Sequence, residues 1–191
     1  MSKTNVKSII IKAAGQHFSR FGFYKTTMDE IAKHIHKAKG VLYYHFKSKE
    51  DLFNEVLKQE LDNVKQELHK IISGPDDALT MFNNYIFTRF DLLHKSETYH
   101  ETLKADFFEK YQFVEEVRED FANFDRNQLR FIISKGIKEG ALEITNLDST
   151  VNLILMVVNS IEIPLFLQNK YLEYIDTGEE LANLIIKGLK S

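Results

Sequence analysis

Residues 26–46, TTMDEIAKHIHKAKGVLYYHF, decide how the first part of this 191-residue chain folds. Thr27 and Glu30 have the spacing of a capping box, which predicts that a short helix begins here. Gly40 to His45 predict a second short helix directly after it. Two short helices joined by a tight turn form a helix-turn-helix.

The helices on either side of this pair follow from the same rules. Apolar residues at i, i+3 and i+4 spacings predict a first helix that ends at Gly22. Ser48 and Asp51 again have capping-box spacing and predict a long fourth helix that reaches about Ile72. The apolar face expected for the first helix comprises Val6, Ile10, Ala13, Ala14, Phe18 and Phe21.

Charge is divided unevenly along the chain. The whole sequence has 25 Lys and Arg and 28 Asp and Glu. The first fifty residues hold ten of the bases and three of the acids, which leaves 15 bases and 25 acids for the remainder. A basic head on an acidic body suggests that the head meets a polyanion, although a solvated charged helix face explains the same numbers.

A helix-turn-helix places its second helix in the DNA major groove, and this accounts for the residues found there. Lys37 and Lys39 stand at the start of that helix, where side chains approach base edges. Tyr43 and His45 stand at its far end, where they can hydrogen-bond phosphate oxygens, and Lys49 adds its charge at the start of the fourth helix.

Four further residues in or next to the same helix complete its expected arrangement. Leu42 and Phe46, four apart, are the predicted inward anchors. Tyr44 either stacks at the groove or packs against the first helix. Gly40 either allows close backbone approach or has a packing role.

Residues 9–53, IIIKAAGQHFSRFGFYKTTMDEIAKHIHKAKGVLYYHFKSKEDLF, resemble the DNA-binding domain of TetR-family bacterial transcriptional regulators. The shared pattern is AA…F…G in the first helix, TT…IA in the second, and G…LYYHF…KE in the third and its exit. The resemblance implies an all-α homodimer that binds a palindromic double-stranded DNA operator, usually as a repressor, and is released by a small molecule. Mapped position by position, the family's DNA-contacting pattern falls on Thr26, Thr27, Lys37, Ala38, Lys39, Val41, Tyr43, Tyr44, His45 and Lys49.

This chain departs from the family at the turn. Family members commonly have Ala-Gly-Val-Ser where the sequence has Ile35-His36-Lys37-Ala38. We therefore expect His36 at positive φ, ending the second helix in a left-handed cap, since His is among the residue types enriched there. Ala38 cannot supply the serine cap, a loss of roughly 0.5–2 kcal/mol.

The remainder of the chain is also helical, and nine helices are expected in all. A fifth helix follows Pro75, a long helix ends at Lys138-Glu-Gly140, Asp148 caps a helix that reaches Leu167, and the last helix covers 177–189. The predicted fold class is all-α, with two domains. These are a three-helix helix-turn-helix DNA-binding domain in residues 1–47 and a helical effector-binding and dimerisation domain in residues 48–191.

The helix expected over 148–167 is apolar on nearly every face. Such a helix is either central to its domain or buries its second face against another chain. With the last helix it can form a four-helix bundle between two subunits, an arrangement that the resembling family uses. We therefore expect a homodimer through the last two helices.

Aromatic residues make up 12% of the chain and are concentrated in the expected helices five to seven. Ordinary core packing is one interpretation; an apolar pocket with a few orienting polar groups, for an apolar or amphipathic effector, is the other. Asn159 and Glu162 need partners if buried, as ligand contacts or as interface pairs. The candidate ligand-binding residues are Phe82, Tyr85, Phe90, Phe107, Phe108, Tyr111, Phe124 and Asn159.

Two other classes of function compete with the DNA-binding interpretation. A helical metal- or ligand-dependent enzyme without DNA binding would need a catalytic motif, but the sequence has no Cys, no HExxH, no phosphate-binding loop and no nucleophile elbow. No catalytic residue, metal ligand or cofactor is therefore predicted. A purely structural helical scaffold leaves the basic head unexplained.

The sequence predicts a cytoplasmic protein. The N-terminal apolar stretch is short and interrupted by charged residues, unlike a signal peptide. VNLILMVVNSIEIPLFL, residues 151–167, is interrupted by Asn159, Glu162 and Pro164, and we expect no membrane helix from it.

Overall fold

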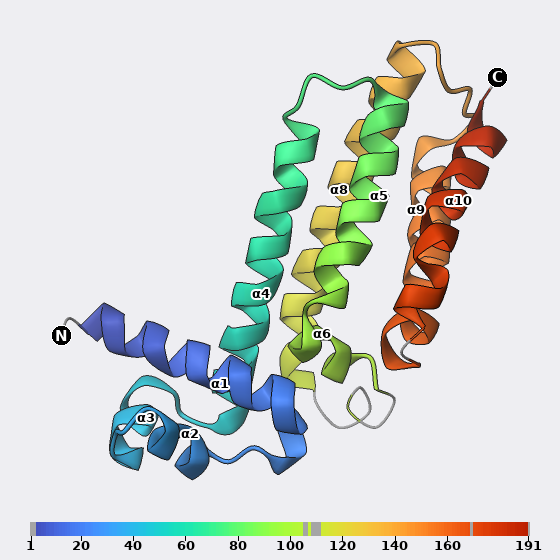
Figure 1. Ribbon diagram of the computed structural model, residues 1–191. Coiled ribbons are helices and arrows are strands. Elements are labelled where there is room, and N and C mark those ends of the chain that lie inside the picture. Colours follow the sequence, from blue (N-terminus) through green and yellow to red (C-terminus); the bar gives the residue numbers. More distant parts are fainter. Residues whose placement is uncertain (1–2, 105–106, 108–111, 169, 191) are drawn as a thin grey trace. The chain divides into compact units, whose positions relative to one another are not determined.

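The computed structural model describes residues 3–104, 107, 112–168 and 170–190. Within these residues there are nine α-helices and no strand, which confirms the all-α prediction (Figure 1). The helices are α1 (Lys3–Lys25), α2 (Met28–His34), α3 (Lys39–His45), α4 (Lys49–Ile72), α5 (Ala78–His94), α6 (Glu97–Thr102), α8 (Glu115–Lys138), α9 (Leu147–Ser160) and α10 (Tyr171–Leu189).

The chain forms two compact units, which we call the head unit and the body unit. The head unit consists of Met1–Asp62 and Ser96–Val117, and the body unit of Asn63–Lys95 and Arg118–Ser191. This division differs from the boundary expected after residue 47, because the first half of α4 packs into the head. There the ring of Phe53 lies 5.0 Å from the ring of Phe18, centroid to centroid.

In the head unit, α1 is broken near its C-terminal end. Gly22 has φ 77° and ψ 169°, a backbone region that is essentially restricted to glycine. The break turns Phe23 into the core, 1% exposed, and leaves Phe21 on the surface. The prediction that Phe21 packs with the apolar face of this helix is therefore wrong: its ring lies on the surface beside His17 and Arg20.

The capping box that opens α2 is present as predicted. The Glu30 N–H donates to the Thr27 hydroxyl at 3.3 Å, and the Thr27 N–H donates to the Glu30 carboxylate at 2.9 Å. At the start of α4, the Asp51 N–H likewise donates to the Ser48 hydroxyl at 3.1 Å. The Asp51 carboxylate accepts from the N–H of Lys47 rather than that of Ser48.

The turn after α2 is a Schellman motif with histidine in the left-handed position. His36 has φ 53°, as predicted, and its N–H donates to the carbonyl of Lys33 at 3.1 Å. The N–H of Lys37 donates to the carbonyl of Ala32 at 3.0 Å. These two bonds end α2 and set the direction in which α3 begins.

The second helix of the motif, α3, is anchored as the sequence predicts. Leu42 and Phe46 are buried, and the other face of the helix is exposed. Figure 1 shows α2 and α3 side by side at one side of α1. This arrangement of three helices is a helix-turn-helix.

In the body unit, α5 lies alongside α10 (Figure 1). Asp77 caps α5 through the N–H groups of Leu79 and Thr80, both at 3.0 Å. The long helix α8 ends as predicted before Gly140, which has φ 71°. The buried side chains of α5, α8 and α10 belong to the core of the body unit.

Three predicted helix boundaries are wrong. The cap expected at Asp148 is instead Asn146, two residues earlier, and α9 already ends at Ser160 rather than at Leu167. A short π-helical turn, Ile163–Leu167, replaces its last part because Pro164 has no N–H with which to continue an α-helix. The last helix begins at Tyr171 rather than at Thr177.

By length and composition alone, Leu147–Leu167 is apolar enough to cross a membrane. The core helix of a packed protein passes the same test, so this result does not contradict the expectation that the segment is no membrane helix. Val151, Ile154, Leu155 and Val158 are nevertheless buried inside the body unit, as in a core helix of a packed bundle.

The left-handed His36 gives a test of the turn. Replacing His36 with Gly should stabilise the protein by about 0.5–1 kcal/mol, because the strain of a Cβ in this region exceeds the entropy that glycine loses. His36→Val should destabilise it by about 1–2 kcal/mol, since a β-branched side chain tolerates positive φ poorly. Urea unfolding curves measure both changes, and equal midpoints for the three proteins would contradict the role given to this residue.

Candidate nucleic-acid interface

The exposed face of α3 gathers most of the predicted DNA contacts. Lys39, Tyr43 and Tyr44 of α3 are exposed, as are Lys37 and Ala38 directly before it. Tyr44 is 68% exposed and Tyr43 45%. The ring of Tyr44 is therefore not part of the buried core of the head unit.

Three further candidates flank this face. Thr27 is exposed at the start of α2, but its hydroxyl takes part in the capping box with Glu30. Val41 and His45 on α3 are partly exposed. The ring of His45 lies 5.1 Å from that of Tyr44, at nearly a right angle.

Thr26 and Lys49 are directed into the head unit. Thr26 is completely buried, and its hydroxyl donates to the carbonyl of Gly22 at 2.8 Å. The ammonium of Lys49 donates to the carbonyl of Phe23 at 2.8 Å and lies 4.2 Å from the centre of the Phe23 ring. Partial burial lowers the pKa of Lys49. Both side chains bind the backbone that α1 exposes at its break, a role that their sequence positions did not indicate.

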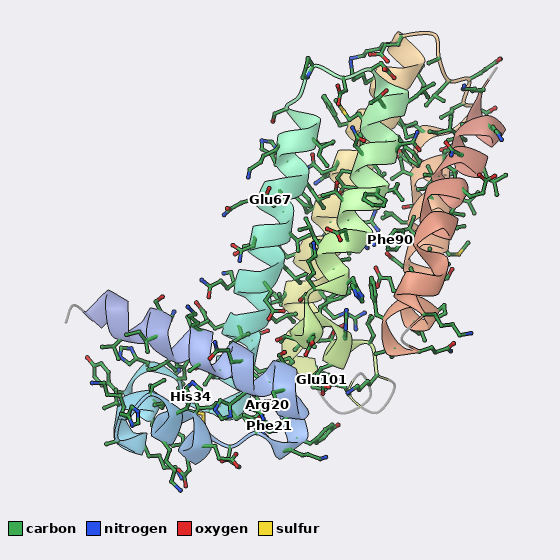
Figure 2. The ribbon with its side chains drawn as sticks, in the orientation of Figure 1. Arg20, Phe21, His34, Glu67, Phe90 and Glu101 are labelled. Carbon is green, nitrogen blue, oxygen red and sulfur yellow. The ribbon has the colours of Figure 1, made fainter. Side chains whose placement is uncertain are left out.

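A short helix from later in the chain binds the same break. Glu101 of α6 lies at the C-terminal end of α1 (Figure 2), where its carboxylate accepts from the N–H of Phe23 at 3.4 Å. A Cβ on Gly22 would stand 3.4 Å from a carboxylate oxygen of Glu101. Ser19 of α1 donates to Glu97 of α6 at 2.5 Å. Two carboxylates therefore connect α6 to α1.

The same helix is also bonded to α4. The carboxylate of Glu60 on α4 accepts hydrogen bonds from the hydroxyls of Ser96 and Thr98, the latter at 2.8 Å. Burial raises the pKa of Glu60, while these two hydrogen bonds oppose the rise. Within the head unit, α6 is thus held between α1 and α4 by polar side chains.

Two imidazoles meet where α1 packs on α2. The rings of His17 and His34 are 5.0 Å apart, edge to face. Burial lowers the pKa of His17, and the neighbouring His34 lowers it further. The nearby Glu30 raises the pKa of His17, and Arg20 lowers it.

One charged partner of the exposed α3 face was not predicted. Asp29, in the first turn of α2, forms an ion pair of 2.8 Å with Lys39, the first residue of α3. The sequence signal is weak, because these two residues approach each other only once the turn at His36 has folded the two helices together.

The candidate ligand-binding residues are divided between the two units. Phe82, Tyr85 and Phe90 are buried on α5 in the body unit, where Phe124 on α8 and Asn159 on α9 also lie. Phe107 instead belongs to the head unit, where its ring lies 5.3 Å from Phe53 and 5.5 Å from Phe23. It is a core residue of the head, and its assignment to an effector site stays a prediction. Phe108 and Tyr111 lie outside the described residues.

A buried charged cluster occupies the centre of the body unit. Arg89 on α5, 2% exposed, donates to Asp125 on α8 at 2.6 Å and to Glu162, just after α9, at 2.8 Å. Arg89 also donates to Asn159 at 3.0 Å, and the Tyr85 hydroxyl donates to Asp125 at 2.6 Å. Asn159 and Glu162, whose partners the sequence left open, therefore both bind Arg89.

This cluster determines how the body unit is packed. Its members come from α5, α8 and the end of α9, so a correct arrangement of these elements is needed to pair every charge. Removing one partner of such a buried pair typically costs about 3–5 kcal/mol, because the other charge stays buried. Burial also raises the pKa of Tyr85 well above its usual value, which keeps the phenol protonated as the donor to Asp125.

The sequence of the head matches a known family. The model of "Bacterial regulatory proteins, tetR family" matches residues 10–56, which cover α2, α3 and the turn between them. The uncharacterized HTH-type transcriptional regulator YhgD of Bacillus subtilis (strain 168) is 33% identical over 141 residues, or 72% of this chain and 72% of YhgD. This similarity extends well beyond the helix-turn-helix.

Solved structures share the fold of the whole chain. A transcriptional regulator from Cytophaga hutchinsonii has a TM-score of 0.80 and 24% identity, covering 96% of this chain and 98% of that chain. The regulator FadR from Bacillus subtilis, solved in complex with stearoyl-CoA, has a TM-score of 0.78 and 17% identity, covering 95% and 98%. Both are similar to this chain along nearly their full length.

The partly buried imidazole of His17 predicts a pH dependence of stability. The pKa of His17 in the folded chain lies below its ordinary value of 6.5, so the unfolded chain takes up a proton first as the pH falls. The contribution of His17 to stability is therefore complete above pH 6.5 and is lost as the pH drops through the lowered pKa.

Urea unfolding at pH of about 7.5 and about 5.5 measures this loss. His17→Gln should lose less stability between the two pH values than the unchanged protein does. His69→Gln, which replaces an exposed imidazole on α4, should retain the full loss. An identical pH dependence in all three proteins would show that His17 is not responsible.

Proposed function

The chain belongs to the TetR family of bacterial regulatory proteins and is a DNA-binding transcriptional regulator, and on that premise we propose that the exposed face of α3 reads its operator. One observation carries the proposal: α3 buries Leu42 and Phe46 but exposes two adjacent tyrosines beside two lysines. A surface of this composition suits contact with bases and phosphates, since lysines and phenols donate to both.

Individual roles follow from position along α3. Lys37 and Lys39, at its start, are assigned to base edges, and the methyl group of Ala38 can meet a thymine methyl. Tyr43 and His45, at its end, are assigned to phosphate oxygens. Tyr44 is assigned to the DNA side because its ring is exposed. Thr26 is left out of this surface, since its hydroxyl is committed inside the head.

Lys49 takes a different role from the one its position suggested. Its ammonium is bonded to the carbonyl of Phe23, so we assign it first to the structure of the head. To contact a phosphate, the ammonium must either bind it in addition to the Phe23 carbonyl or give up its hydrogen bond to that carbonyl. Loss of Lys49 should accordingly lower stability as well as DNA affinity.

We propose a homodimer through α9 and α10. Leu153 and Met156 of α9 are 56% and 64% exposed, and Leu184 of α10 is 56% exposed. Large apolar side chains that remain exposed on two helices of one unit fit a surface that a second copy covers. The operator is then a palindrome, with half-sites about one DNA turn, or ~34–36 Å, apart. Such a regulator works on chromosomal DNA, which puts it in the cytoplasm.

We further propose that a small amphipathic molecule releases the protein from its operator, which would make it a repressor. The buried aromatic rings of the body unit, with Phe90 labelled in Figure 2, offer an apolar environment, and the Arg89 cluster offers polar groups beside it. FadR, whose structure contains stearoyl-CoA, has this fold with an acyl ligand. The effector of this chain is therefore sought among molecules with an apolar body and a polar head.

The covalent link between the two units supports such a switch. Helix α4 runs without interruption from Lys49 to Ile72, so its first half belongs to the head and its second half to the body. A ligand that moves the second half of α4 also moves the first. To change operator occupancy from 99:1 to 1:99, the ligand must favour one arrangement by roughly 5.5 kcal/mol.

Selection of bound duplexes from a random pool tests the function directly. The purified protein should enrich one palindromic sequence, which would also report the two-fold symmetry of the dimer. Enrichment of no sequence would overturn the assignment of α3 as a reading helix. Enrichment of a single half-site without symmetry would overturn the dimer alone.

Gly40 provides a prediction with opposite signs for stability and binding. A Cβ on Gly40 would meet no atom within 4 Å, so nothing inside the chain requires glycine there. Gly40→Ala should stabilise the protein by up to about 1 kcal/mol, since alanine favours helix, yet weaken operator binding if DNA approaches the backbone closely.

The matched control for this variant is Gly188→Ala. Gly188 in α10 is also helical with open space around it, so its replacement should stabilise similarly; because α10 belongs to the proposed dimer surface, its DNA affinity is compared once size-exclusion chromatography has shown the same oligomeric state as the unchanged protein. Thermal melting and operator titration measure the two effects. Unchanged operator affinity for Gly40→Ala would argue against close approach at this point of α3.

The effector proposal predicts that ligand binding and DNA release change together. A panel of amphipathic molecules that includes stearoyl-CoA and free fatty acids should contain a compound that raises the melting temperature and lowers operator affinity. Phe82→Leu, which alters a buried ring of the body unit, should diminish both effects, whereas Phe131→Leu, on the exposed face of α8, should not. A ligand that stabilises the protein without changing DNA affinity would contradict the switch.

A further inference from the structure

An ion pair joins the two helices of the helix-turn-helix on their exposed side. The ammonium of Lys39 lies 2.8 Å from a carboxylate oxygen of Asp29 and 5.7 Å from the centre of the Tyr43 ring. The side chains of Lys39 and Asp29 are 54% and 53% exposed, so the pair is formed at the surface. Exposed pairs of this kind contribute little to stability.

The other two lysines assigned to DNA are situated differently. Lys37 is exposed and has no ion-pair partner among the residues that the structure describes. Lys49 is bonded to a neutral carbonyl. Lys39 alone of these three is paired with a carboxylate, on a surface where any carboxylate repels the phosphates of DNA.

The chemistry of an ammonium group suggests a use for this carboxylate. A lysine ammonium has three N–H donors, and a hydrogen bond to Asp29 occupies one of them. The other two remain for acceptors in the groove, such as the O6 and N7 atoms of guanine. An unrestrained lysine, in contrast, is attracted to phosphates along any DNA sequence.

We propose that Asp29 is a specificity-determining residue: it holds the ammonium of Lys39 for base acceptors and withholds it from phosphates. This inference rests on the proposed function of α3 as the reading helix. The negative charge of Asp29 lowers the affinity of the protein for every DNA sequence. A hydrogen bond from Lys39 to a base offsets this loss, and it forms only on sequences that place an acceptor there. The ratio of operator to random-DNA affinity is therefore larger with Asp29 than without it.

The state of Lys39 is consistent with this role. The hydrogen bond that Lys39 donates to Asp29 raises the pKa of Lys39, so the group stays an ammonium at every pH at which DNA binding is measured. Asp29 also has a fixed position, because the capping box holds the first turn of α2 in place. The orientation of the ammonium thus depends on the fold of the turn.

Asp29→Asn tests the proposal with the full-length protein, the selected operator and a random duplex over a range of salt concentrations. Affinity for the random duplex should rise roughly 3–10-fold, and its salt dependence should steepen by about 0.9, the value for one additional phosphate contact. Operator affinity should change less, so that the specificity ratio falls. Circular dichroism and melting curves check that α2 is intact.

Two further variants separate Asp29 from a general effect of charge. Glu55→Gln also removes one acid from the head unit and opens an exposed pair of the same kind, between Glu55 and Lys7, at 3.0 Å. It should leave the specificity ratio unchanged. In a Lys39→Ala background, Asp29→Asn should no longer steepen the salt dependence, because the lysine that it releases is absent.

Each outcome decides the matter. If Asp29→Asn and Glu55→Gln raise both affinities equally, or if the effects of Asp29→Asn and Lys39→Ala simply add, Asp29 acts only as a general negative charge and the inference is wrong. If the unchanged protein prefers no duplex at all, the proposed reading function fails and this inference fails with it. Preference for an operator without coupling between Asp29 and Lys39 overturns the inference alone.

Discussion

The head unit depends on the break in α1 at Gly22. With φ 77° and ψ 169°, this residue interrupts the helix and leaves backbone groups that need partners. Three side chains supply them: Thr26 binds the carbonyl of Gly22, Lys49 the carbonyl of Phe23, and Glu101 the N–H of Phe23. Side chains from α4, from α6 and from the segment before α2 are thus bonded to one point of the backbone.

The two units use charge in different ways, and burial explains the difference. Around Arg89 both carboxylate partners, Asp125 and Glu162, are buried, so each charge depends on the others and the cluster permits few alternative packings of the body. Asp29 and Lys39 are hydrated, so their pair can open at small cost and can respond to an approaching polyanion. A buried cluster suits a stable framework, and an exposed pair suits recognition.

Much of the candidate DNA surface could be predicted from the sequence, whereas little of the candidate effector site could. The left-handed His36 and the anchors Leu42 and Phe46 follow from spacing within a few residues, and the structure confirms them. Phe107 could not be assigned in this way. A phenylalanine ring suits a ligand pocket and a protein core equally. Only the rings that it contacts in the head unit show that it packs in the core there.

The sequence by itself determined the local elements of this protein: the capping box, the Schellman turn and the buried face of α3. These depend on side chains and backbone groups no more than about one helical turn apart. Only the tertiary structure decided the partners of Lys49, Arg89 and Glu101, which lie 26, 73 and 78 residues away in the chain. A charged side chain binds whichever polar group the folded core brings within hydrogen-bonding distance, and no pattern of neighbouring residues identifies a partner so far away in the sequence.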